Sequence, residues 1–213
     1  VENGVVNLRM GWCQPNEPSL LITKRCNAKY DKKAECPRWL RCLSEIFVKA
    51  DGTPDVDTIA SVQMLLGLTL TGEAGEEIIV FCVGFGANGK SIFSNVVAAI
   101  LGEYAKTAPP SLLSARRTDD HGARPDMAML PGARLVSINE LPGGMHLDEV
   151  VAKQIAGREP IAARHLYGDF FSFIPSFTPW VRTNHKPIVK GDDDGIWRRI
   201  VILPFRRTFE KHE

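Results

Sequence analysis

Apolar residues follow one another at two different spacings along the chain. In residues 37–47, and again from Asp57 onward, they recur every three to four positions, which predicts two amphipathic helices, the first opened by Pro37 and the second capped by Asp57. From Ile78 to Val83 the pattern becomes a continuous apolar run rich in β-branched residues, as in a strand buried on both faces. The stretch "TGEAGEE" separates the two patterns and predicts a boundary between two regions.

Strands and helices alternate in the rest of the chain. Apolar segments at residues 133–138, 178–182 and 199–203 predict three further strands, and an apolar stripe that includes Val150 predicts a helix between the first two. Alternation of this kind is typical of an α/β fold with a largely parallel sheet. We therefore expect a small, mostly helical amino-terminal subdomain in residues 1–76 and an α/β domain in residues 77–213.

Composition and charge narrow the class of protein. The chain has 213 residues, of which 44% are hydrophobic and 24% charged, as in an ordinary globular protein. It has no secretory signal and no apolar run of the ~18 residues that a membrane span needs, so we expect a cytoplasmic protein with reduced cysteines and no membrane partner. It begins with Val rather than Met, so we expect a part of a longer protein. With a net charge of +1, contact with nucleic acid would require positive charge gathered locally.

The stretch "VFCVGFGANGKSIF" contains two overlapping phosphate-binding patterns. Gly84, Gly86 and Gly89 fit G-x-G-x-x-G, the pattern of dinucleotide-binding folds. Gly84, Gly89, Lys90 and Ser91 fit G-x-x-x-x-G-K-S, the P-loop of nucleoside triphosphatases. Both patterns require a strand before the glycines and a helix after them, so this context alone does not choose between them.

The P-loop interpretation explains more of the sequence. A dinucleotide site needs an acidic residue ~20 positions onward at a strand end, whereas Glu103 at that distance follows an expected helix end. In a P-loop, the glycines let backbone N–H groups wrap the phosphates, Lys90 supplies positive charge, and the Ser91 hydroxyl ligates Mg²⁺. The residues that we expect to surround the nucleotide are Gly84, Phe85, Gly86, Ala87, Asn88, Gly89, Lys90, Ser91 and Ile92.

Polar residues that follow later strands could complete a catalytic site. Glu140 ends the apolar segment "ARLVSINE", and Asn184 follows the apolar part of "FTPWVRTNHKP". Arg198 and Arg199 begin the last expected strand. Taken alone, these could be a surface acid, a turn asparagine and a surface arginine pair. Together with a P-loop they indicate a carboxylate that holds metal or water, an amide that aligns the water, and a cation that stabilises the phosphoryl group.

In this order the motifs resemble those of superfamily 3 helicases, and most of all the helicase part of phage- and plasmid-encoded primase–helicases related to poxvirus primase–helicases. "GFGANGKS", with Asn88 before Gly-Lys-Ser, is similar to the P-loop of that superfamily, and "ARLVSINE" to its second acidic motif. Residues 151–175 resemble its extra motif, and "VRTNHKP" and "GIWRRIVILPF" its sensor asparagine and arginine finger. Residues 22–47 resemble the region ahead of its P-loop.

The resemblance implies an AAA+-like P-loop NTPase core that binds ATP and Mg²⁺ and assembles as a homo-hexamer. It implies that Glu140 activates water, that Asn184 senses the γ-phosphate, and that an arginine acts on the nucleotide of a neighbouring subunit. Arg199 aligns best with this finger, and Arg198 is the near alternative. Lys90, Glu140, Asn184, Arg199 and Arg198 are therefore the expected catalytic residues.

The chain departs from the family pattern at the metal site. Many members have two acidic residues in the second motif, where this chain has Asn139 followed by Glu140. Asn139 can orient a metal-bound water but brings no charge. The expected Mg²⁺ residues are thus Ser91, Glu140 and Asn139, with one carboxylate among them.

The extra motif suggests contact with single-stranded DNA. In relatives it forms a hairpin that lines a central pore with basic residues at its tip, and the resemblance places Arg164 and His165 at such a tip. Lys153 and Arg158 are further candidates, although Lys153 could act at the nucleotide instead. The alternative is a solvated turn whose aromatic residues belong to the core.

These expectations together predict an ATP-dependent DNA helicase motor that hydrolyses ATP at subunit interfaces during replication of phage, plasmid or mobile-element DNA. One alternative is a nucleotide-gated module that loads onto DNA without separating strands. Another is a decayed prophage remnant with little activity. A dinucleotide-binding oxidoreductase is a more distant possibility.

Overall fold

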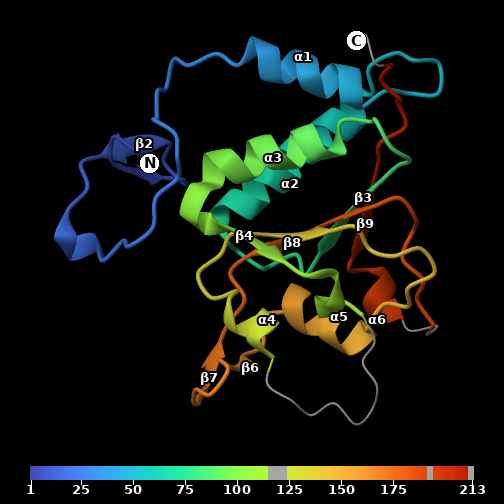
Figure 1. Ribbon diagram of the computed structural model, residues 1–213. Coiled ribbons are helices and arrows are strands. Elements are labelled where there is room, and N and C mark those ends of the chain that lie inside the picture. The colour runs from blue at the N-terminus through green and yellow to red at the C-terminus, as the bar shows by residue number, and fades with distance from the viewer. Residues whose placement is uncertain (115–123, 191–193, 211–213) are drawn as a thin grey trace.

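The centre of the molecule is a five-stranded parallel sheet (Figure 1). The computed structural model describes residues 1–114, 124–190 and 194–210. The strand order across the sheet is β4-β5-β8-β3-β9. The strands are β3 (Ile79–Val83), β4 (Ala105–Ala108), β5 (Leu135–Asn139), β8 (Thr178–Thr183) and β9 (Ile200–Pro204). The α/β fold with a parallel sheet, expected from the alternating pattern, is confirmed.

Helices cover both faces of this sheet (Figure 1). One face carries α1 (Pro37–Ile46), α2 (Val56–Thr71) and α3 (Lys90–Leu101). The other carries α4 (Pro125–Ala128), α5 (Glu149–Ala156) and α6 (Asp194–Trp197). Because residues alternate between faces along a strand, each strand contributes to two cores.

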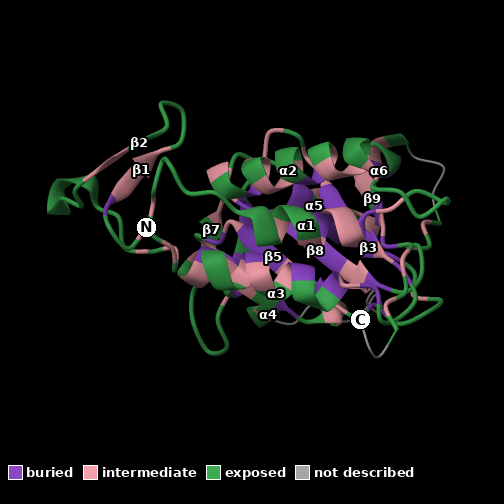
Figure 2. Ribbon diagram, turned by 90° about the horizontal axis from the view of Figure 1, so that it is seen from above, coloured by how far each residue is buried: buried purple, intermediate pink, exposed green. Residues whose placement is uncertain are grey.

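The two cores explain why the strand sequences are apolar on both sides. Ile79 and Phe81 of β3 join the core beneath α5, whereas Val80 and Cys82 join the core beneath α1, α2 and α3. Figure 2 shows these buried strands between helices whose outer surfaces are exposed. Cys82 is 1% exposed, and its burial raises the pKa of the thiol to about 12, so it acts as a small core residue as its apolar surroundings predict.

Smaller elements flank the sheet. Strands β1 (Val5–Asn7) and β2 (Trp12–Gln14) form an antiparallel pair near the amino terminus, and β6 (Ile161–Arg164) and β7 (Phe170–Phe173) form a hairpin. Short 3₁₀ turns occur at η1 (Pro18–Leu20), η2 (Gly102–Tyr104) and η3 (Pro110–Leu112). Helices α1 and α2 share their core with the sheet, and the subdomain boundary near residue 76 stays a prediction.

Two local expectations were wrong. The cap of α2 is Asp55, whose carboxylate accepts hydrogen bonds from the backbone N–H and the hydroxyl of Thr58 at 3.1 and 2.9 Å. Asp57 lies inside the first turn, because the helix begins at Val56 rather than after Asp57. Val150, expected on the apolar stripe of α5, is 67% exposed, since the buried face of that short helix is formed by Val151, Ala152 and Ile155.

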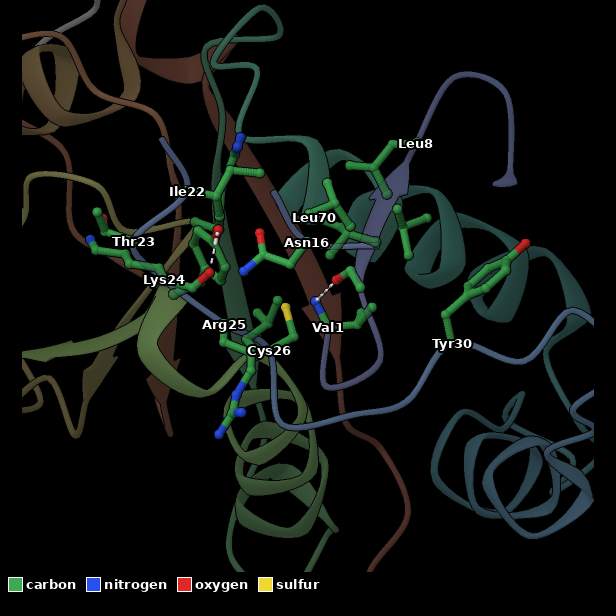
Figure 3. Close-up of a pocket in the computed structure, with 16 residues that line it drawn as sticks. Val1, Leu8, Asn16, Ile22, Thr23, Lys24, Arg25, Cys26, Tyr30 and Leu70 are labelled. Atoms are coloured by element: carbon green, nitrogen blue, oxygen red, sulfur yellow. Dashed lines mark hydrogen bonds between the residues drawn. The ribbon is translucent and has the colours of Figure 1, made fainter. Parts of the chain in front are cut away.

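A cavity of about 620 Å³ lies between the amino-terminal segment and the main body (Figure 3). Its wall includes Lys24 and Cys26 from that segment, and Tyr104 and Arg134, which immediately precede β4 and β5. It therefore lies at the amino ends of the strands. In the described residues, no helix is long and apolar enough to cross a membrane.

Candidate nucleotide site

The glycine loop joins the carboxyl end of β3 to the amino end of α3, as a P-loop requires. Gly84 is fixed by its surroundings: a Cβ there would lie 2.3 Å from the backbone oxygen of Phe205 and 2.4 Å from Nδ2 of Asn88. Gly89 caps α3 with φ +83°, and a Cβ there would lie 2.7 Å from Cγ1 of Ile46. Both positions thus demand glycine for space, and Gly89 also for its backbone conformation.

Lys90 is held inside this loop. Its side chain is 8% exposed, and its Nζ donates hydrogen bonds to the backbone oxygen of Gly84, to Oδ1 of Asn88 at 3.1 Å and to Oδ1 of Asn184 at 3.5 Å. Burial lowers the pKa of the Lys90 ammonium from its usual value. All three acceptors are neutral amide oxygens. They orient the ammonium without neutralising its charge, which suits it to meet an anionic ligand.

Asn88 organises the loop from within. It is buried, its Nδ2 donates to the backbone oxygen of Phe205 at 3.5 Å, and its Oδ1 also accepts from the backbone N–H of Lys90 at 3.4 Å. The segment after β9 braces the same loop, because the N–H of Phe209 donates to the backbone oxygen of Ala87 at 2.7 Å. The sequence analysis missed this brace, since no local pattern marks it.

The exposed part of the loop consists of Phe85, Gly86 and Ala87. Gly86 and Ala87 have φ +51° and +39°, so the chain turns here through conformations that side chains rarely adopt. Ser91 and Ile92 are exposed at the first turn of α3. The backbone conformation and the helix amino terminus are those of an anion-binding loop.

Asn139 is the last residue of β5 and Glu140 follows it, at the same edge of the sheet as the glycine loop. Glu140 is exposed, and its N–H donates to the backbone oxygen of Arg182 at 2.9 Å. Its φ of +59° is unusual for a residue other than glycine, and such strain is concentrated at functional sites. Oδ1 of Asn139 accepts hydrogen bonds from Nε of Arg182 at 2.7 Å and from the Ser137 hydroxyl at 3.1 Å.

These contacts bear on the expected Mg²⁺ ligands. The oxygen of Asn139 already faces two donors, which leaves the Ser91 hydroxyl and the Glu140 carboxylate as the exposed oxygen ligands. No three His, Cys, Asp or Glu side chains gather into a metal-binding group within the described ranges. The residues therefore fit a cation that takes most of its ligands from phosphates and water, as Mg²⁺ does in nucleotide sites.

The dinucleotide interpretation fails on the position of Glu103. This residue lies in η2, directly before β4, and its carboxylate accepts a hydrogen bond from the N–H of Arg25 at 2.9 Å. Since β4 is parallel to the other strands, Glu103 lies at the amino ends of the strands, whereas the glycine loop follows the carboxyl end of β3. It cannot serve a ribose bound at the loop.

Arg198 and Arg199 lie between α6 and β9, at the amino ends of the strands. Arg199 is 12% exposed in its side chain, pairs with Glu77, and donates from Nη1 to the backbone oxygen of Gly195 at 2.6 Å. Arg198 is 68% exposed and lies 3.5 Å from the same carboxylate. The length of β3, roughly 13 Å at the usual strand rise, separates this pair from the glycine loop of its own chain.

The β6–β7 hairpin also lies away from the loop, since it leads into the amino end of β8 (Figure 1). Arg164 is the last residue of β6 and lies over the Phe170 ring, 4.8 Å from its centroid. His165 stacks on Phe171 with ring centroids 5.3 Å apart. Beyond them the tip is apolar: Leu166 is 64% exposed and Tyr167 is 99% exposed. His165 opens the turn, since the N–H of Gly168 donates to its backbone oxygen at 3.0 Å, and contact of Arg164 and His165 with DNA stays a prediction.

The remaining DNA candidates are not on the hairpin. Lys153 is half-buried on α5. Arg158 is exposed, and its Nη2 donates to the backbone oxygen of Gly75 at 2.5 Å. The structure thus gathers the P-loop, Asn184, Asn139 and Glu140 at the carboxyl ends of the strands, and leaves the finger and hairpin residues at the other end.

Comparisons with known proteins agree with this architecture. Residues 1–48 match the family described as "D5 N terminal like". The chain is 31% identical over 211 residues to "Putative helicase L207/L206" of Acanthamoeba polyphaga mimivirus, which covers 99% of this chain and 22% of that protein. It is 27% identical over 191 residues to "Putative helicase 022R" of Frog virus 3, covering 86% of this chain and 19% of that protein.

Solved structures show the same fold. The NrS-1 C terminal region superposes with a TM-score of 0.55 at 15% identity, over 81% of this chain and 38% of that one. The JCV helicase does so with a TM-score of 0.53 at 11% identity, over 79% and 43%. Together these matches support a primase–helicase of the superfamily 3 type. The chain spans about a fifth of the length of these curated relatives.

Proposed function

We propose that this superfamily 3 chain is the ATP-hydrolysing motor of a DNA helicase that acts in the replication of viral or other mobile-element DNA. The observation that carries the proposal is that Nζ of Lys90 hydrogen-bonds both to the backbone oxygen of Gly84 and to Oδ1 of Asn184. These bonds bring the proposed phosphate-binding loop after β3 together with the proposed water-aligning residue after β8. The names of the similar viral proteins support the helicase class.

The residues divide the work of phosphoryl transfer. The P-loop N–H groups and Lys90 bind the phosphates of ATP, and Ser91 with Glu140 would hold Mg²⁺, which would neutralise part of their charge. The Asn184 amide orients a water for attack on the γ-phosphorus. As the new P–O bond forms and the bond to the β-phosphate oxygen breaks, Glu140 accepts the proton of that water.

Completion of the site requires a neighbouring subunit. The arginine pair lies at the other end of the strands from its own P-loop, so an arginine finger would have to act across an interface of a homo-hexamer. Arg199 is engaged by Glu77 and Gly195, whereas the Arg198 side chain is largely exposed. We therefore assign the finger to Arg198 and a structural role to Arg199.

The hairpin is the proposed DNA contact. Tyr167 at its tip offers an exposed ring on which a base of single-stranded DNA can stack, and such stacking does not depend on sequence. Arg164 and His165 lie next to it and can donate hydrogen bonds to the phosphates, and both are preorganised by their contacts with Phe170 and Phe171. Lys153 and Arg158 stay further candidates for contact with DNA.

A strand-displacement assay tests the motor. Unwinding of a forked duplex that needs ATP, Mg²⁺ and Lys90 would support the proposal, with Arg41→Gln as a control at an exposed arginine on α1. Single-stranded DNA that stimulates ATP hydrolysis without strand displacement would instead favour the nucleotide-gated loading module. Absence of both activities in an assembled ring would contradict both functions.

A further inference from the structure

Arg182 is a charged residue within an otherwise apolar strand. It lies near the carboxyl end of β8, in register with Cys82 of β3 on one side and with Asn139 of β5 on the other. Cys82 belongs to the core beneath α3, so the shared register places the Arg182 side chain on the face of the sheet from which α3 and Lys90 begin. Its side chain is half-buried there.

The contacts of Arg182 orient its guanidinium without neutralising it. Its Nε donates to the neutral Oδ1 of Asn139 at 2.7 Å, and it makes no ion pair within the described ranges. Burial lowers the pKa of Lys90 and the charge of Arg182 lowers it further, which agrees with a position close to the P-loop lysine. Among the residues that the structure describes, only its Nε donates a hydrogen bond, so the two terminal nitrogens remain as the donors of the planar fork.

Two cations thus lie at the carboxyl ends of neighbouring strands, each positioned by amide oxygens rather than by a carboxylate. Like charges that are close together raise the free energy of the site until an anion binds. The oxygens of a triphosphate match this arrangement, because a guanidinium offers paired donors to phosphate and an ammonium offers a point charge. Arg182 is the register partner of Asn139, and its backbone oxygen accepts the N–H of Glu140 at 2.9 Å.

We propose that Arg182 is a phosphate-contacting residue of the same subunit, directed at the terminal phosphate of ATP. The inference rests on the proposed ATP site and adds to it a residue that neither the motifs nor the comparisons assign. It also gives a physical reason for Asn139: an aspartate at that position would form an ion pair with Arg182 and cancel the charge that the phosphate requires.

Equilibrium binding of mant-ATP and mant-ADP in Mg²⁺ tests this assignment, because it needs one subunit and no turnover. For Arg182→Gln we expect affinity for mant-ATP to fall about 10- to 100-fold, as for loss of a charge-assisted hydrogen bond, with less than about a threefold change for mant-ADP. Asn139→Asp should also lower the ratio of mant-ATP affinity to mant-ADP affinity. Arg41→Gln, the loss of an exposed arginine elsewhere, should change neither affinity.

Arg182→Lys retains the charge without the fork, and is expected to keep part of the preference; it also serves as the test if Arg182→Gln does not fold. An unchanged ratio of mant-ATP to mant-ADP affinity in a folded Arg182 variant overturns the assignment and leaves the ATP site standing. Equal loss of both nucleotides would likewise overturn it, because it would indicate a general structural role. Failure of the wild-type chain to bind either nucleotide in a Lys90-dependent way would overturn the proposed ATP site itself.

Discussion

Replacement of Arg198 and of Arg199 by glutamine should have opposite effects on activity and stability. Arg199 is 12% exposed in its side chain and bonds to Glu77 and to the backbone oxygen of Gly195, whereas Arg198 is 68% exposed. If Arg198 is the finger, Arg198→Gln should abolish turnover in an intact fold. Arg199→Gln should lower the stability of the fold and leave the ATP turnover of the molecules that remain folded unchanged.

The magnitudes follow from burial. Removing one partner of a fully buried ion pair costs about 3–5 kcal/mol, and because Glu77 is 30% exposed we expect a smaller cost, about 2 kcal/mol, for Arg199→Gln. For a chain of this size that corresponds to a fall in Tm of roughly 4–8 °C. The exposed Arg198 pair contributes at most about 0.5 kcal/mol, whereas loss of an arginine finger lowers turnover by about 10³-fold or more.

Thermal unfolding and ATP turnover, measured on the same preparations well below Tm, separate these effects. The turnover is measured at protein concentrations where the wild type has assembled, since the finger acts between subunits. Wild-type turnover in Arg198→Gln would refute the assignment of the finger. A stable but inactive Arg199→Gln would reverse it and return the finger to Arg199.

Three further predictions concern stability and DNA binding. Gly89→Ala should lower the free energy of unfolding by about 2–3 kcal/mol in urea titrations, because the position combines a positive φ with a clash at Cβ. Gly67→Ala, in open space on α2, should raise the free energy of unfolding by about 0.5–1 kcal/mol. Equal effects of the two substitutions would contradict the geometry of the loop. Asp55→Ala should cost about 1 kcal/mol and Asp57→Ala less than about 0.5 kcal/mol, since only the former caps α2; the reverse order would show that the helix begins later. Tyr167→Ala should weaken binding of single-stranded DNA, measured by fluorescence anisotropy, by about 1–3 kcal/mol without changing Tm, because the ring is fully exposed; unchanged affinity would exclude the tip as a stacking surface.

Local pattern was sufficient to predict the strand, the glycine loop and the helix that follow one another at residues 79–101. The continuous apolar run of β3 predicts a strand buried on both faces, and the glycines predict a turn that side chains would block. Strand β4 was not predicted, because its sequence "AKTA" is short and half polar, as an edge strand can be.

Contacts between distant segments could not be predicted from local pattern. The bond between Arg182 and Asn139 depends on the register of β5 with β8, and the brace from Phe209 to Ala87 depends on where the chain runs after β9. An arginine within the strand sequence "TPWVRT" was the one local signal of the former, because a charge in a buried strand needs a partner.

ATP turnover by the wild-type chain and by Lys90→Ala, over a range of protein concentrations and with or without single-stranded DNA, tests the central claim most directly. The account predicts turnover that requires Lys90, rises more than in proportion to protein concentration as subunits meet, and increases when DNA is added. Full turnover by Lys90→Ala would contradict the account. So would the absence of turnover in every assembled preparation of the wild type.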